Sequence, residues 1–360
     1  MNLKICPFFL SLFLMTALLV SPALSSNDDL SIKGKVYFDA YYVTVTATNF
    51  NNKNGEFSNL VGSLPSESSG RGGFQIRRIY LTFQKKLSEK ISARIRFETG
   101  NSSYKYNADK SMIPFVKDAW LKIKLSQLHS TVLGIQAPPT LLLYEEKLWR
   151  YRAVEKVPED LYKIRSSRDF GVSLKGNFES LNYSVMFGNG KGSETESQTF
   201  KEVKTLYLNL NYFFSKSLFI ELYGDIDLIP DSFLKKDTSH ILIGYISDKI
   251  RTGFQYIYQE SGKSVLAKYI NIISIPFVLN ISKNLSILAR FDNRTQYSPS
   301  IKATVGKMKD NFIILGADAL ISKNVHLIPN VEIGTYSYEK NNSANSSLDA
   351  VARLTLYFKY

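Results

Sequence analysis

The sequence predicts an all-β protein, a transmembrane antiparallel β-barrel of about 16 strands. Three observations support this fold class. Apolar and polar residues alternate through most of the 360 residues, which is the pattern of strands with two different faces. Short and long polar connections follow each other in turn, as in outer-membrane barrels. After residue 25 no apolar stretch is long enough for a spanning helix, so only a closed barrel could cross a membrane.

The N-terminus has the order of a secretory signal peptide. Lys4 precedes an apolar run over residues 8–20, and small residues such as Ala23 and Ser25 follow. We therefore expect a signal peptide over residues 1–25 and an outer-membrane barrel domain over residues 26–360. Its removal would take away one lysine and the single Cys6, and would lower the formal net charge from +13 to +12. The exported chain would then contain no disulfide.

Period-two alternation predicts the strands one by one. In the run Ile91–Glu98, for example, every second residue is apolar. The predicted strands are 34–50, 73–87, 91–100, 113–125, 130–137, 168–178, 181–188, 200–214, 218–229, 238–247, 250–259, 265–279, 285–294, 311–321, 325–338 and 347–360.

The connections between these strands fall into two sets. Short polar clusters such as Ser215–Ser217 and Ser322–Asn324 predict tight hairpin turns. The other set is longer and comprises 51–72, 101–112, 137–167, 188–200, 229–237, 295–308 and 339–347. A soluble β-sandwich, the alternative fold, does not predict this rhythm. Aromatic residues gather near the strand ends, and the chain stops on Tyr357–Tyr360, which resembles the terminal signal for the outer-membrane insertion machinery.

If the apolar positions face lipid, the residues between them face the lumen. A lysine or arginine on the lipid face would cost about 2–4 kcal/mol at mid-depth. The inward basic positions are then Arg78, Arg94, Arg96, Lys122, Lys124, Lys175, Arg251, Arg290, Arg294, Arg353 and Lys359, and the inward acidic ones are Glu98, Asp118, Glu221, Asp225, Asp227, Asp292, Asp318 and Glu332. A lumen with so many charges is expected to hold water, because about 16 strands leave an aqueous channel.

The charges are unevenly distributed along the chain. The basic residues concentrate in the second to fourth strands and the acidic ones in the ninth, which suggests a transverse field across the lumen. The alternative is that these charges only hydrate the wall and pair with each other. From the strands we select Arg78, Arg94, Arg96, Lys122, Lys124, Arg290 and Arg294 as pore-lining candidates.

The segment 137–167 differs from the other long connections. It contains Tyr144, Leu148, Trp149 and Tyr151, which a loop in water would not need. We therefore expect this third loop to fold back into the lumen and to narrow it with charged side chains. Its candidate constriction residues are Lys147, Arg150, Arg152, Lys163 and Arg165. The alternative is a short surface helix that caps the rim.

Three sequence motifs, in this order, resemble the phosphate-selective porin O and P family of outer-membrane porins. They are Phe74-Gln75-Ile76-Arg77-Arg78, Gly134-Ile135-Gln136-Ala137-Pro138-Pro139 and Arg168-Asp169-Phe170-Gly171-Val172-Ser173-Leu174-Lys175-Gly176. The resemblance implies a sixteen-stranded, usually trimeric channel. The best-known members of the family bind phosphate through an arginine ladder and third-loop lysines. Because this lumen also contains many acids, the resemblance implies a porin but does not imply phosphate selectivity.

The predicted function is a porin of the Gram-negative outer membrane, a water-filled channel for passive diffusion of small hydrophilic solutes. The positive net charge favours anions. Expected partners are lipid, lipopolysaccharide, small ions, the insertion machinery and a homotrimer, but not nucleic acid. No cofactor or metal is expected, because one Cys and three His leave little room for a metal centre. The alternatives are a plugged structural or adhesive barrel and, less favoured, an enzyme that would use His240 at one rim.

Overall fold

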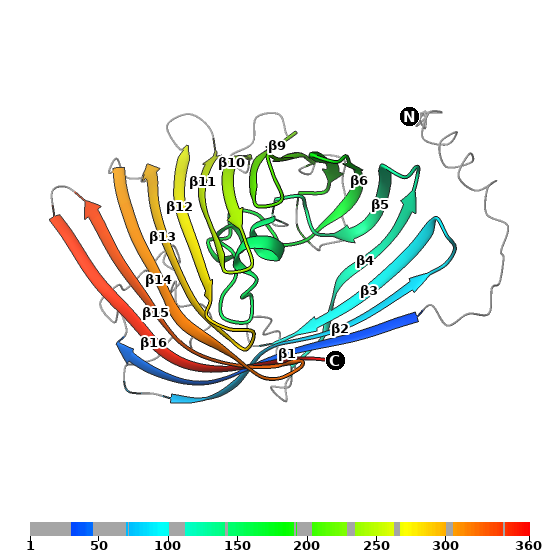
Figure 1. Ribbon diagram of the computed structural model, residues 1–360. Helices are drawn as coiled ribbons and strands as arrows, with labels where there is room; N and C mark the ends of the chain where they lie inside the picture. Colours follow the sequence, from blue (N-terminus) through cyan, green and yellow to red (C-terminus); the bar gives the residue numbers. More distant parts are fainter. Residues whose placement is uncertain are drawn as a thin grey trace.

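A computed structural model describes residues 30–45, 70, 72–100, 112–140, 143–190, 192, 204–228, 235–262, 267–299, 305–340 and 343–360. It contains sixteen antiparallel strands in a closed barrel (Figure 1). The predicted signal peptide lies outside the described residues. The strands are β1 (Leu30–Val45), β2 (Gly72–Lys86), β3 (Ile91–Thr99), β4 (Phe115–Lys124), β5 (His129–Gln136), β6 (Asp169–Asn177), β7 (Leu181–Gly188), β8 (Thr205–Phe213), β9 (Leu218–Asp227), β10 (Lys236–Ile246), β11 (Ile250–Ser261), β12 (Lys268–Asn280), β13 (Leu285–Pro299), β14 (Val305–Ser322), β15 (Val325–Lys340) and β16 (Ser343–Lys359).

The first and last strands close the barrel. β1 pairs with both β2 and β16, and Lys35 lies opposite Lys359. The backbone N–H of Gly34 donates to the carbonyl of Tyr360 at 2.9 Å. Every strand therefore has two neighbours, so the sheet has no free edge. The two ends of the described chain meet at the side of the short turns, as an even strand count requires.

The fold class and the strand number are confirmed, but several predicted loop boundaries are wrong, most clearly those near the ends of β13, β14 and β16. Residues 295–299 and 305–308 belong to β13 and β14, and β16 begins at Ser343 rather than at 347. In this part Thr295 pairs with Lys309 and Tyr297 with Lys307. The backbone ladder continues there, although the apolar alternation has ended. A prediction from hydrophobic periodicity alone therefore stops these strands too early.

The outer face of the barrel is apolar. Leu208, Leu222, Ile243, Leu315 and Leu354 are each more than a third exposed and come from strands all round the barrel. Such a band is what the hydrocarbon layer requires. No helix among the described residues is long and apolar enough to cross a membrane.

The inner face is not uniformly polar. On β9 to β14 several inward residues are apolar, and they are fully buried: Phe219, Leu242, Ile257, Ile272, Leu288, Phe312 and Ile314. The expectation that apolar positions face lipid is therefore wrong for these residues. Their presence means that something other than water fills this side of the lumen.

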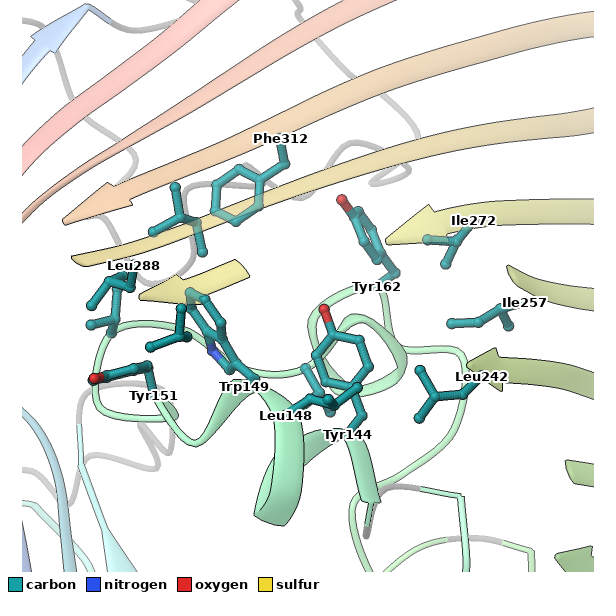
Figure 2. Packing of buried hydrophobic residues seen from close by; sticks show 14 of the residues in the cluster. Tyr144, Leu148, Trp149, Tyr151, Tyr162, Leu242, Ile257, Ile272, Leu288 and Phe312 are labelled. Atoms are coloured by element: carbon teal, nitrogen blue, oxygen red, sulfur yellow. The ribbon is translucent and has the colours of Figure 1, made fainter. Parts of the chain in front are cut away.

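The third loop fills that side. Between β5 and β6 the chain turns into the barrel (Figure 1) and forms a π-helical turn, η2 (Tyr144–Trp149), and a short helix, α2 (Pro158–Leu161). Tyr144, Leu148 and Trp149 turn toward the apolar wall residues (Figure 2), and each is at most 1% exposed. Full burial of one large apolar side chain contributes about 1.5–3 kcal/mol. The loop is thus packed against β9 to β14 like part of a soluble core, which confirms the predicted inward fold.

Candidate functional site

A cavity of about 810 Å³ lies between the loop and the part of the wall that the loop leaves uncovered. The wall side chains come mainly from β1 to β6 and β16. Ten of the lining residues are basic: Lys35, Arg94, Arg96, Lys122, Lys124, Arg150, Arg152, Arg168, Lys175 and Lys359. Three are acidic: Asp118, Glu145 and Glu146. The cavity therefore has a strongly positive lining in a low-dielectric surround, which attracts anions.

The arginines of the cavity gather around one carboxylate. Asp118 forms an ion pair with Arg96 at 3.2 Å and a longer one with Arg94 at 4.0 Å. It also forms an ion pair with Arg168. Arg94 and Arg96 follow each other on the inner face of β3, while Arg168 lies just before β6. Since one carboxylate serves three guanidinium groups, the cluster keeps an excess of positive charge.

Five lysines continue the basic lining toward the short-turn end of the barrel. Lys122 and Lys124 follow Trp120 on the inner face of β4, and Lys175 lies on β6. Lys35 and Lys359 are direct partners in the β1–β16 ladder. Like charges in direct opposition destabilise a sheet. Within the described ranges these five lysines make no ion pair, so their charge is left available to a solute.

The acidic edge of the cavity belongs to the loop. Glu145 and Glu146 lie in the first turn of η2 and line the cavity. Arg152 bridges Glu145 at 2.7 Å and Asp160 of α2 at 2.6 Å. Burial opposes ionisation of Asp160, but Arg152 and then Lys156 hold the pKa of this carboxyl well below its usual range. The two turns of the loop are therefore joined by a charged bridge at the cavity surface.

The acidic residues of β9 do not form the opposite pole of a transverse field in this cavity. Asp225 and Asp227 bind Arg165 from the loop. Glu221 lies 2.9 Å from the imidazole Nε2 of His240. Their charges are thus compensated at the interface between loop and wall. The positive wall of the cavity faces Glu145 and Glu146 instead.

Arg77 fastens the loop to β2. The β1–β2 register shifts between Tyr37 and Phe38, which pair with Arg78 and Ile76. At this β-bulge the consecutive residues Arg77 and Arg78 are both buried. Arg77 donates to the carbonyls of Ala153 and Val154, and it pairs with Glu155 at 3.2 Å. Burial of Glu155 would raise its pKa, but Arg77 holds it below the usual range.

His240 fastens the loop to β9 and β10. Its Nδ1 lies 3.3 Å from Glu159 of α2, and its ring stacks on Tyr223 at 4.8 Å. Gln255 donates to the same Glu159 at 2.6 Å. The histidine is therefore part of a buried clamp and not a rim residue beside Asp237 and Ser239.

The twelve pore-lining candidates fall into three groups. Arg94, Arg96, Lys122, Lys124, Arg150 and Arg152 line the cavity. Lys147 and Lys163 are exposed loop residues outside its lining. Arg78, Arg165, Arg290 and Arg294 are buried beside Glu98, Asp225, Asp292 and Asp310 respectively. The alternation places these strand arginines and lysines on the inner face, but it does not show which of them the loop covers.

Several cavity residues were not among these candidates. Periodicity already predicted that Lys175 and Lys359 face inward, although they were not selected as pore-lining candidates. Lys35 lies on an alternating strand, so periodicity could have found it as well. Arg168 follows the loop, and its role depends on Asp118 of a distant strand. Trp120 has a sequence signal of its own, because it occupies an inward position between Asp118 and Lys122.

Two residues of the second motif behind the family resemblance, Gly134 and Gln136, have structural roles at the end of β5. Gln136 donates to the carbonyls of Val132 at 3.0 Å and Gly171 at 3.2 Å, and it accepts from Ser173 at 2.7 Å. Gly134 has a φ of +125°, and a Cβ there would lie 2.1 Å from the Ala119 carbonyl oxygen. These residues shape the point where β5 leaves the wall and the loop begins.

The chain matches no protein-family model and no curated protein. Solved structures of outer-membrane proteins are similar to it over nearly the whole chain. An anion-selective porin from Comamonas acidovorans is 13% identical, with a TM-score of 0.59 over 92% of this chain and 99% of that one. The outer-membrane channel DcaP of Acinetobacter baumannii is also 13% identical, with a TM-score of 0.59 over 92% and 97%.

A third similar structure is OmpT, an outer membrane protein of Vibrio cholerae, in its trimer form. It is 10% identical, with a TM-score of 0.62 over 92% of this chain and 99% of that one. Likeness at such low identity concerns the fold. Together with the closed sixteen-stranded sheet and the inward third loop, it shows that this chain has the fold of outer-membrane porins.

Proposed function

We propose that the chain is an outer-membrane porin that lets small hydrophilic solutes diffuse passively and favours anions. The observation that carries the proposal is the charge of the cavity lining, ten basic residues against three acidic ones. This argument is stronger than the one from net charge, because exposed turns and loops also contribute to net charge. The lipid-facing band and the barrel fold support a place in the outer membrane. Export with removal of residues 1–25 stays a prediction from the sequence.

Two other functions have weaker support. A plugged structural or adhesive barrel would need the loop to close the lumen, whereas the loop packs against β9 to β14 and leaves the cavity beside β1 to β6. An enzyme would need a nucleophile or metal with a free base. His240 is instead held between two glutamates, and among the described residues no group of three or more His, Cys, Asp or Glu could hold a metal ion.

Selectivity for phosphate does not follow from the family resemblance, and phosphate is one of the anions that the proposed channel would pass. The arginines around Asp118 and the five lysines would suit any small oxyanion, since charge-assisted hydrogen bonds to such groups are strong. A homotrimer and lipopolysaccharide phosphates are the partners we propose. The trimer form of the similar OmpT is consistent with such an assembly.

The test is planar-bilayer recording of the refolded mature chain across a KCl gradient. We expect stable conductance steps and a reversal potential on the anion side. The double variant Lys122→Glu/Lys175→Glu changes the lining by four charge units and should move the reversal potential toward cations. Lys216→Glu/Lys283→Glu makes the same charge change in two exposed turns and serves as the matched control.

The outcomes separate the candidates. A cation-sided reversal in the unchanged protein, or equal shifts in both double variants, would contradict the proposed lining. Absence of steps from a correctly folded barrel would favour the plugged barrel. Block of chloride current by low phosphate would support the specific family role, and steps without this block would leave a general anion channel.

A further inference from the structure

Trp120 is the unusual residue of the cavity lining. It is one of two tryptophans in the chain, and it lies half-buried on the inner face of β4 among basic side chains. The other, Trp149, has a clear structural role, since it is fully buried and its indole N–H donates to the Glu155 carbonyl at 2.9 Å. In the described part of the chain the indole N–H of Trp120 has no acceptor. A large aromatic surface and a free donor thus face the water of the cavity.

The neighbours of Trp120 hold one side of this surface and leave the other open. Its partner across the ladder on β3 is Arg94, whose guanidinium lies 4.9 Å from the indole centroid. Gln84 fixes that guanidinium by accepting from Nε at 3.1 Å and from Nη2 at 2.7 Å. On the other side Trp120 lies opposite Gly134, which lies opposite Gly171. Two glycines in register place no side chain on the wall beside the ring.

An unpaired cation stands next to this platform. Lys122 is the next inward residue on β4, so its Cα is about 7 Å from that of Trp120. Within the described residues it makes no ion pair. The wall therefore offers, side by side, a fixed guanidinium, a free ammonium, an indole face and an indole N–H donor. An inorganic anion can use the charges and the N–H donor, whereas only a flat organic anion would also use the indole face.

We propose that Arg94, Trp120 and Lys122 form a binding subsite for organic anions with a flat apolar body, of which aromatic carboxylates are the simplest. The carboxylate pairs with Lys122 and Arg94, and the ring packs on or against the edge of the indole. The inference rests on the proposed channel function, because it assigns a solute class to the same cavity.

The test compares benzoate with acetate as inhibitors of chloride current in the refolded chain, at constant ionic strength. Both carry one carboxylate, so the ratio of their inhibitory concentrations isolates the ring. We expect benzoate to inhibit at roughly three- to tenfold lower concentration than acetate, in line with the strength of aromatic contacts. In Trp120→Leu this ratio should fall to about one. Trp120→Phe keeps a smaller ring and should retain part of it.

Tyr357→Leu is the matched control. Tyr357 also lines the cavity, but its ring is engaged by His326 at 5.1 Å and by Tyr37 at 5.3 Å. The variant should keep the ratio of the unchanged protein. A ratio near one in the unchanged protein, or an equal loss in Tyr357→Leu, would overturn the subsite.

Fluorescence gives a readout that does not depend on conduction. Acrylamide, a neutral quencher, should reach Trp120 but not the fully buried Trp149. Benzoate should protect Trp120 from quenching more than acetate does, and Trp120→Leu should abolish this effect. Protection without any conductance would refute the channel and keep the subsite. Anion-sided conductance without protection would refute the subsite and keep the channel.

Discussion

Replacement of Trp149 by alanine should release the third loop while the barrel stays closed. The side chain is fully buried between loop and wall (Figure 2). Its ring packs edge-on against Tyr151 at 5.7 Å, and the guanidinium of Arg290 lies 5.2 Å from its centroid. The sixteen strands do not depend on these contacts, because each is hydrogen-bonded to both neighbours. The change therefore acts on loop docking.

The expected cost follows from these contacts. Truncation of a buried tryptophan to alanine costs about 3–5 kcal/mol, which includes the cavity left behind. The lost hydrogen bond to the Glu155 carbonyl contributes about 1 kcal/mol to such a value. Since each 1.4 kcal/mol is a factor of ten, the ratio of docked to undocked loop should fall by about two to nearly four orders of magnitude.

Single-channel recording and limited trypsin digestion would detect this change. We expect larger and noisier conductance steps, because the undocked loop frees the side of the lumen that it fills. Trypsin should cleave faster after Lys147, Arg150 or Lys156. Phe74→Ala, which truncates a ring that is 78% exposed, is the control. Trp149→Ala with the conductance and cleavage pattern of the unchanged protein would refute the idea that this core holds the loop.

Three further predictions concern the loop anchors, the wall and pH. His240→Ala leaves Glu159 and Glu221 buried without the imidazole that both contact, which should weaken loop docking by about 1–3 kcal/mol in digestion assays, because buried polar groups lose a partner. His240→Gln should lose less, and an indifferent His240→Ala would contradict the clamp. Gly134→Ala should lower the yield of folded, heat-modifiable barrel, because the new Cβ would clash with the Ala119 carbonyl oxygen, whereas Ala119→Gly should fold normally. Asp160 and Glu155 have lowered pKa values, so their contribution to docking is fully present above their unfolded values of about 4 and is lost only as pH falls below them. Conductance should therefore be the same at pH 7 and pH 5, and an increase at pH 5 would count against these anchors.

The sequence predicted the barrel because its signals are local. A strand between lipid and water alternates residue by residue, and a tight turn needs only three or four polar residues, so sixteen strands could be counted without knowledge of contacts. The inward third loop was also predictable, since Trp149 and Tyr144 would be costly in open water. Both inferences depend on whether a segment contacts lipid, water or protein, and the composition of the segment itself reflects that environment.

The charge arrangement was less predictable because it depends on partners from distant segments. Arg290 and Arg94 look alike in sequence, as inward arginines on alternating strands. Arg290 lies under the loop with Asp292, whereas Arg94 faces the cavity. One overlooked signal could have separated them. In β12 both faces are apolar, as Ile272 and Ile273 show, which indicates a wall covered on both sides.

That two-sided apolar strand affects how the protein must assemble. Until the loop packs on one face and lipid on the other, the run Tyr269–Leu279 is an uncharged, β-prone segment of the kind that aggregates. Pro276 has no backbone N–H and cannot donate a hydrogen bond to a neighbouring strand, so it weakens the tendency of this segment to aggregate. Before the barrel forms, this strand is therefore exposed to aggregation on both of its faces. When the third loop docks, it covers the lumenal face of β12.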